Sequence, residues 1–168
     1  MSGWVRSAGS LMLATMLLAL APAAMAGGPN SPVLVTTGAV IQSESSGEPI
    51  QVDPGAWLLF RTGNAVTDEF IDNLDSITIE ILLDGESLEV ETVIEDLGET
   101  CGVGGDPEAC ADAEVLWGYA SSHPLSPGSV HTLTYRHTAS EAGQDGFGNS
   151  WDAGVFFEST ATLVAGGD

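Results

Sequence analysis

The chain has 168 residues, and its 24 Asp and Glu outnumber its three Lys and Arg so strongly that the formal net charge at pH 7 is −21. So few cations cannot pair the carboxylates internally, so solvent salt or divalent metal must screen them. The same imbalance excludes nucleic acid and anionic membrane surfaces as partners, because both bind through basic patches.

The first 26 residues have the three parts of a secretory signal peptide. Arg6 gives a positive start, Leu11 to Leu20 form an apolar run, and Ala24-Met25-Ala26 offers the small residues that signal peptidase reads. A membrane anchor is less favoured, because the apolar run is too short to span a bilayer. We expect cleavage after Ala26, which leaves residues 27–168 as a single domain, secreted or periplasmic, with no membrane insertion.

Apolar residues alternate with polar ones along most of residues 27–168, which predicts a series of short strands. The first of these are expected at Val33–Ile41, Ile50–Val52 and Trp57–Thr62. One short helical turn follows, because Thr67 can cap a helix whose first residues, Asp68 and Glu69, suit the positive end of the helix dipole. This stretch is acidic, and we interpret it as a solvated helix face rather than a cation site; its carboxylates are Asp68, Glu69, Asp72 and Asp75.

A hairpin is predicted over residues 76–95, because Asp84-Gly85 separates two alternating apolar runs and favours a type I′ turn. A two-residue loop pairs Leu83 with Glu86, Ile81 with Leu88 and Ile79 with Val90, which places the apolar residues on one face. The same register puts Glu80 opposite Glu89. That pair would repel unless salt or a cation screens it.

Cys101 and Cys110 flank a glycine-rich segment, and an even pair of cysteines in an exported protein predicts a disulfide. The loop is short, so the bond should stabilise the fold by about 2–3 kcal/mol through the entropy of the unfolded chain. A metal–thiolate site is the alternative, with Asp106, Glu108 or His123 as further ligands. The cysteines lack the C-x-x-C spacing of structural zinc sites, so the disulfide is preferred.

Three further strands are expected at Val115–Ala120, Ser129–Thr138 and Val155–Val164. In the last, the residues predicted to face inward are Val155, Phe157, Ser159, Ala161 and Leu163. Many short strands with turn signals between them predict an all-β fold, an antiparallel β-sandwich of about seven to eight strands with one short helical turn.

Two segments carry a resemblance to a known group of domains. The segment from Leu125 to Tyr135, with its Ser-Pro-Gly turn before a strand, resembles the late strand of bacterial immunoglobulin-like extracellular domains. Pro54-Gly55 before Trp57 to Phe60 resembles the opening of an early core strand in them. From about Pro49 to Val164 the layout is similar to uncharacterised exported bacterial sandwich domains. The resemblance implies an antiparallel immunoglobulin-like β-sandwich as the structural framework, and it brings no catalytic residues. The short cysteine loop is unlike the inter-sheet bridge of antibody domains.

The best ligand-site candidate is a calcium site in the glycine-rich segment 141–152. Glu141, Asp145, Asn149 and Asp152 offer the hard oxygen ligands that calcium prefers. The segment lacks the D-x-D-x-D-G pattern and final glutamate of an EF-hand, so an acidic loop held by Trp151 and local turns is the simpler alternative. No other cofactor is expected.

Signs of enzymatic chemistry are weak. His131 and His137 share a strand face but are about 20 Å apart along it, and no serine lies in G-x-S-x-G, so we expect no enzyme. Trp57, Trp117 and Trp151 could stack on sugars, although buried sandwich tryptophans are commoner. We therefore predict a non-enzymatic binding or cell-envelope interaction module whose partner is an extracellular protein or glycan. The alternatives are a carbohydrate-binding accessory module, with two tryptophans exposed on one flat face, or a small secreted hydrolase.

Overall fold

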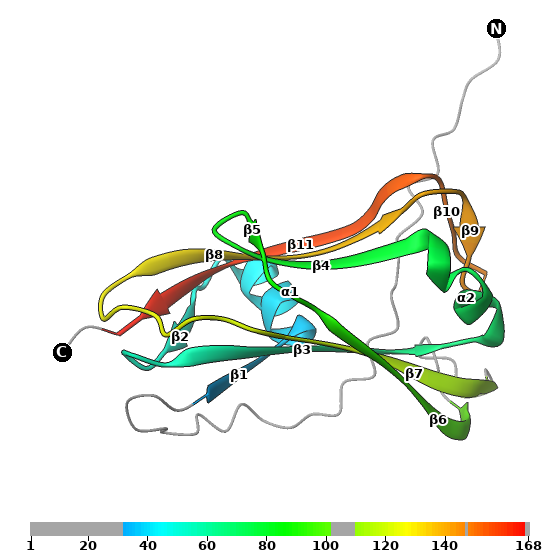
Figure 1. Cartoon of the computed structure of the whole chain (residues 1–168), viewed down its shortest axis with the longest axis horizontal. Coiled ribbons are helices and arrows are strands. Elements are labelled where there is room, and N and C mark those ends of the chain that lie inside the picture. The colour runs from blue at the N-terminus through cyan, green and yellow to red at the C-terminus, as the bar shows by residue number, and fades with distance from the viewer. Residues whose placement is uncertain (1–31, 102–109, 147, 167–168) are drawn as a thin grey trace, which may run out of the picture.

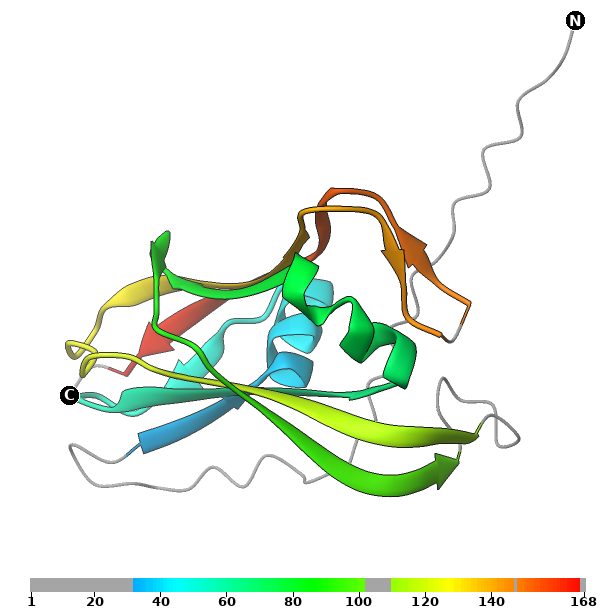
Figure 2. The same cartoon turned by 45° about the vertical axis from the view of Figure 1, so that its right-hand side comes forward.

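The structure is a computed structural model that describes residues 32–101, 110–146 and 148–166. The expected signal peptide, residues 1–26, lies outside the described residues. The described chain is mostly β-strand, and its two larger sheets face each other with a helix between them (Figures 1 and 2). No described helix has the length and apolar character needed to cross a membrane.

Sheet A has four strands in the order β1-β3-β7-β6. Their bounds are β1 Pro32–Thr36, β3 Trp57–Val66, β7 Cys110–Ser121 and β6 Glu91–Cys101. β7 pairs antiparallel with both β3 and β6, whereas β1 runs parallel to β3 at the edge of the sheet.

Sheet B has five strands in the order β2-β11-β8-β4-β5. Their bounds are β2 Ile50–Val52, β11 Gly154–Ala165, β8 Val130–Ala139, β4 Ile77–Leu83 and β5 Glu86–Ser87. Edge strand β2 is parallel to β11, so the expectation of purely antiparallel sheets is wrong at an edge of each sheet. A separate small hairpin joins β9, Gly143–Gln144, to β10, Ser150–Trp151.

Helix α1, Thr37–Ser46, replaces the second half of the strand expected at Val33–Ile41. Its start is fixed by Thr36, whose Oγ1 accepts a hydrogen bond from the Ala39 N–H at 3.3 Å, and its end by Gly47 at a φ of 72°. These capping signals outweigh the strand preference of Val40 and Ile41. The helix carries the chain from the edge of sheet A to the edge of sheet B and buries Val40 in the core (Figure 1).

Helix α2, Asp68–Asp72, confirms the expected helical turn. Thr67 Oγ1 accepts a hydrogen bond from the Phe70 N–H at 3.2 Å, as an N-cap should. A 3₁₀ turn, η1 at Leu74–Ser76, follows and leads into β4. Phe70 and Leu74 pack with Trp151 in a small apolar cluster at one end of the molecule.

The main core lies between the sheets and includes Phe60 from sheet A and Ile81, Leu133, Tyr135 and Leu163 from sheet B, all fully buried. In β3, β8 and β11 buried side chains alternate with half-buried or exposed ones where the strand crosses the core. The sequence-predicted inward face of β11 is correct for Ser159, Ala161 and Leu163 but wrong for Val155, which is 56% exposed. A register irregularity between Val155 and Phe157 shifts the alternation there.

The predicted turn at Asp84-Gly85 is confirmed, with φ values of 55° and 82° at its two residues. Leu83 pairs with Glu86, and the Leu88 N–H donates to the Ile81 carbonyl at 2.8 Å. Beyond Leu88 the predicted pairing of Ile79 with Val90 is wrong, because the chain crosses to sheet A and becomes β6. We call Leu88–Val90 the crossover.

Glu80 therefore does not lie opposite Glu89. Its register partner is Arg136 of β8, and Arg136 is also the partner of Glu158 in β11. The Arg136 guanidinium lies 3.7 Å from the Glu80 carboxylate and 2.5 Å from that of Glu158. Bonding to Glu158 raises the pKa of Arg136, so one arginine holds three strands of sheet B together on their outer face.

Candidate binding surface at the crossover and β6

A groove of about 550 Å³ opens where the crossover meets β6. It arises because the pairing of β7 with β3 and the pairing of β7 with β6 begin at different residues of β7. β3 pairs with β7 as far as Leu59 and Ser121, whereas β6 pairs with β7 only from Glu91 and Tyr119 onward. The chain before Glu91 leaves β7 for sheet B, and the groove is the wedge that this departure leaves.

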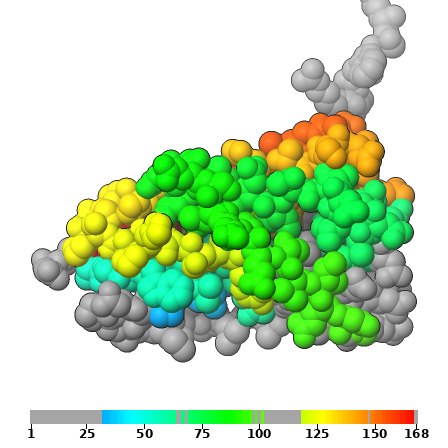
Figure 3. Space-filling model, in the orientation of Figure 1, coloured from blue at the N-terminus to red at the C-terminus, as the bar shows by residue number. Residues whose placement is uncertain are grey.

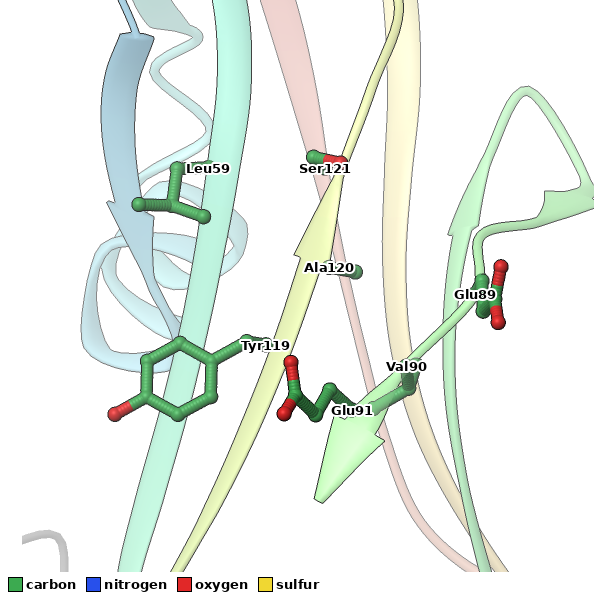
Figure 4. A pocket seen from close by; sticks show the side chains of 7 residues that line it. All are labelled: Leu59, Glu89, Val90, Glu91, Tyr119, Ala120 and Ser121. Atoms are coloured by element: carbon green, nitrogen blue, oxygen red, sulfur yellow. The ribbon is translucent and has the colours of Figure 1, made fainter. Parts of the chain in front are cut away.

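Seven residues line the groove, drawn as sticks in Figure 4: Leu59, Glu89, Val90, Glu91, Tyr119, Ala120 and Ser121. The Tyr119 ring extends over β3, and the Glu91 side chain reaches toward β7 (Figure 4). The Arg61 guanidinium carbon lies 6.0 Å from the centre of the Tyr119 ring. The groove thus combines apolar walls with two exposed carboxylates, those of Glu89 and Glu91.

β6 leaves this groove as an edge strand with an unusual burial pattern. Every residue from Glu91 to Asp96 is exposed, whereas β8 alternates buried and half-buried side chains over its core residues. Val93 is 41% exposed and its neighbour Ile94 is 44% exposed, so apolar side chains emerge on both faces of the strand. The crossover and β6, in green, lie on the visible face of the molecule (Figure 3).

The ladder geometry also shows which backbone groups of β6 point outward. The Ser122 N–H donates to the Leu58 carbonyl, so even-numbered residues of β7 bond to β3 and odd-numbered ones bond to β6. Tyr119 is the partner of Glu91, so odd-numbered residues of β6 bond to β7. The N–H and C=O groups of Thr92 and Ile94 consequently point to the side of β6 that has no partner strand among the described residues.

Two of the predicted calcium ligands, Asp145 and Asn149, lie in contact in the described structure. Asp145 accepts hydrogen bonds from the N–H and side-chain amide of Asn149 at 3.0 and 2.6 Å, and its carbonyl accepts one from Thr67 at 2.6 Å. Glu141 and Asp152 are exposed on either side of the β9–β10 hairpin. Across the residues that the structure describes, no group of three or more His, Cys, Asp or Glu is placed to hold a metal ion. The calcium site stays a hypothesis beside the simpler alternative of an acidic loop.

Within the acidic stretch at α2, Glu69 accepts a hydrogen bond from the Gln144 side chain. Asp72 and Asp75 are exposed. The contact through Glu69 ties α2 to the β9–β10 hairpin, which the sequence did not predict, while the exposure of Asp72 and Asp75 agrees with the solvated helix face expected of this stretch.

Three residues that the sequence did not connect form a chain of hydrogen bonds at the other end of the sandwich. His131 Nδ1 lies 2.6 Å from the Asp84 carboxylate, and His131 Nε2 lies 2.7 Å from Ser129 Oγ. The bond from His131, with one from the Thr132 N–H, lowers the pKa of Asp84. A Ser–His–Asp series in this order can activate a serine. Ser129 Oγ is also 2.6 Å from the Ser126 carbonyl, however, and His131 of β8 thereby connects the turn at Asp84 with the turn that precedes β8.

His137 is placed differently, because it is 2% exposed between the sheets. Burial lowers its pKa to about 4. The Tyr135 hydroxyl bonds to His137 Nε2 and accepts a hydrogen bond from Thr62 Oγ1 at 3.0 Å. His131 and His137 are on one strand face, as expected, while the exposed His123 lies in the loop before β8.

Cys101 and Cys110 are register partners at the end of the β6–β7 ladder. Directly opposed residues in an antiparallel pair have Cα atoms about 4.5–5.5 Å apart, a separation that a disulfide spans. The disulfide itself stays a prediction. The segment between the cysteines, with the alternative metal ligands Asp106 and Glu108, lies outside the described residues.

The tryptophans do not form the flat exposed face that sugar stacking needs, as far as their side chains are described. Trp151 is 8% exposed and stacks on Phe156 with ring centres 4.9 Å apart. Trp57 is half-buried, and the side chain of Trp117 lies outside the described residues.

Sequence reasoning missed the groove, because Glu89 and Glu91 look like the solvent face of a continuous hairpin. The available signal was the Glu80–Glu89 repulsion, which argued against that pairing.

Comparison with known proteins gives little further guidance. No protein family matches the chain, and no curated protein matches it significantly. It has a weak structural similarity to a cysteine protease inhibitor from Entamoeba histolytica, with a TM-score of 0.40 and 10% sequence identity over 83% of this chain and 99% of that one. A likeness at this level assigns neither fold nor function.

Proposed function

We propose that this chain is a secreted or periplasmic, non-enzymatic binding module with an immunoglobulin-like sandwich fold, and that an extracellular protein occupies the groove and β6. The export-signal pattern supports the compartment. The resemblance of residues Leu125 to Tyr135 and the two facing sheets support the fold. The observation that carries the binding role is the exposure of six consecutive residues of β6, Glu91 to Asp96.

Exposed edge strands are templates for pairing, and proteins usually shorten, bulge or cover them. β6 is 11 residues long and keeps Val93 and Ile94 in solvent. Burying these side chains would release apolar surface from water, which favours association. The carboxylates beside them keep the strand soluble and repel a like-charged neighbour. Exposed apolar side chains beside carboxylates therefore suit a surface that binds one complementary partner.

The two alternatives have less support. A glycan-binding face needs two exposed tryptophans, and Trp151 is packed against Phe156 and Phe70 instead. Hydrolysis is favoured by one observation, the Ser129–His131–Asp84 series. Its serine hydroxyl has a second acceptor in the Ser126 carbonyl, which competes with the histidine for the proton. We therefore interpret the series as a hydrogen-bond network with a structural role rather than as a catalytic triad.

Selection of binders from a phage-displayed random peptide library with the mature protein tests the proposal. Recovered peptides should lose about tenfold or more in affinity for Val93→Ser with Ile94→Ser, as expected when anchor side chains are truncated. They should bind normally to the control Val130→Ser with Val155→Ser, which removes two aliphatic residues of sheet B that are even more exposed, at 64% and 56%. A serine-reactive fluorophosphonate should leave Ser129 unlabelled. Recovery of no peptide, equal binding to both variants, or labelling of Ser129 would overturn the proposal.

A further inference from the structure

We infer that the ligand is an extended basic peptide segment that adds to the open edge of β6 as a further strand; this inference rests on the proposed function and names its partner class. Strand addition takes its affinity from main-chain hydrogen bonds and its specificity from alternate side chains. β6 offers both features. The backbone groups of Thr92 and Ile94 point to the open side, and their side chains alternate in direction with those of Glu91 and Val93.

The regular part of this edge has a definite length. It begins at Glu91, where the ladder with β7 starts, and ends at Asp96, where the register breaks before Glu99. Gly98, at a φ of 69°, forms this irregularity, and its N–H donates to the Asp96 carboxylate at 2.8 Å. Six residues at about 3.4 Å each span about 20 Å, so the edge accommodates an extended segment of about six residues.

Charge complementarity indicates which side chains the bound peptide segment should carry. Glu89 and Glu91 are exposed at the head of the edge, and the chain contains no lysine. Of the two arginines beyond the expected signal peptide, Arg136 pairs with Glu80 and Glu158, and Arg61 lies on β3 beside Tyr119, with β7 between it and β6. A ligand that carries Lys or Arg opposite Glu91 supplies the missing cation, since opposite charges directly across an antiparallel pair attract. An aliphatic residue should lie opposite Val93.

A second copy of this chain is the alternative occupant, and charge argues against it. Two copies would bring together two β6 edges with carboxylates at Glu89 and Glu91, and each copy is strongly acidic overall. Like charges opposed across a strand pair are destabilising. Acidic edge residues therefore prevent self-association while they leave the edge open to a basic strand.

The test uses the mature full-length protein and a synthetic probe, acetyl-Lys-Lys-Val-Val-Thr-Lys-amide, designed to lie antiparallel to β6 with its final lysine opposite Glu91. Binding is measured by fluorescence anisotropy. N-methylation of the third and fifth residues removes the N–H groups that would face Ile94 and Thr92. That change should weaken binding about tenfold, whereas N-methylation of the second and fourth residues, which face solvent, should have little effect.

Charge is tested separately. Glu89→Gln with Glu91→Gln should weaken binding about tenfold in dilute buffer, and less near 1 M salt, where the Debye length falls to about 3 Å. The control Glu48→Gln with Asp53→Asn makes the same change in net charge at exposed sites away from β6 and should bind normally. An acidic probe with Glu for each Lys should not bind.

The outcomes separate this inference from the proposed function. Equal effects of the two N-methylation patterns would show that the peptide does not pair with β6, and equal effects of the two charge variants would show only general attraction to an acidic protein. Either result overturns the strand-addition inference. If the basic probe fails while library-selected peptides still depend on Val93 and Ile94, the proposed function stands and this ligand class is wrong.

Discussion

The buried imidazole of His137 predicts how the stability of this fold depends on pH. His137 is enclosed by aromatic rings, with the Tyr135, Phe156 and Phe157 ring centres 4.8, 5.5 and 5.8 Å away. Burial lowers its pKa from 6.5 to about 4, because a charged ring loses its hydration between the sheets. The Tyr135 hydroxyl can donate to the unprotonated Nε2, which also favours the neutral ring.

The sign and size of the effect follow from proton uptake. An unfolded histidine binds a proton near pH 6.5, and His137 in the folded protein does so near pH 4, so the unfolded state binds more protons between these values. Above about pH 7.5 the His137 ring is neutral in both states, and its effect on the free energy of unfolding is at its most favourable. This stability is lost as the pH falls from 6.5 toward 4, because the unfolded state takes up the proton first. One pKa unit corresponds to about 1.4 kcal/mol, so about 2 kcal/mol is lost by pH 5 and about 3 kcal/mol by pH 4.

Comparison with a variant isolates this contribution from the carboxylates, whose protonation relieves repulsion and acts in the opposite direction. His137→Gln keeps an acceptor for the Tyr135 hydroxyl but does not titrate. Urea unfolding at pH 7.5 and pH 5 should show that the wild type loses about 2 kcal/mol more stability than this variant. His123→Gln, which removes an exposed imidazole, should follow the wild type. Parallel pH curves for wild type and His137→Gln would refute the reasoning.

Two further predictions concern the cysteines and calcium. Protein exported by a bacterial host should begin at Gly27 and have a mass two hydrogens below the reduced value, since Cys101 and Cys110 are register partners; thiol labelling of both cysteines in the native protein would contradict this. Calcium and magnesium at matched ionic strength should raise the thermal midpoint equally, because both Asp145 carboxylate oxygens already accept hydrogen bonds from Asn149. A calcium-specific increase that disappears in Asp145→Asn with Asp152→Asn, but persists in Asp68→Asn with Asp72→Asn, would establish the site instead.

Local features of the sequence were sufficient to predict the structure where interactions between residues close in the sequence determine the backbone conformation. Asp84-Gly85 specifies its turn because few residues tolerate the positive φ values of a type I′ turn. Thr67 specifies the start of α2 because its hydroxyl can accept a hydrogen bond from an N–H three residues later. The alternation around Leu133, Tyr135 and His137 likewise places these residues on one strand face, because successive side chains of a strand point to opposite faces, and the structure buries all three.

Tertiary structure decided which strands pair, and with that choice it decided the candidate binding surface. The segment after Asp84-Gly85 could continue a hairpin with β4 or cross to β7, and its alternation of apolar and polar residues is compatible with both. The structure pairs this segment with β7 from Glu91 onward, whereas Glu80 of β4 contacts Arg136 of β8, on the side of β4 opposite to β5. The groove and the open edge of β6 exist only because the chain changes sheets, a choice made by contacts between residues far apart in the sequence.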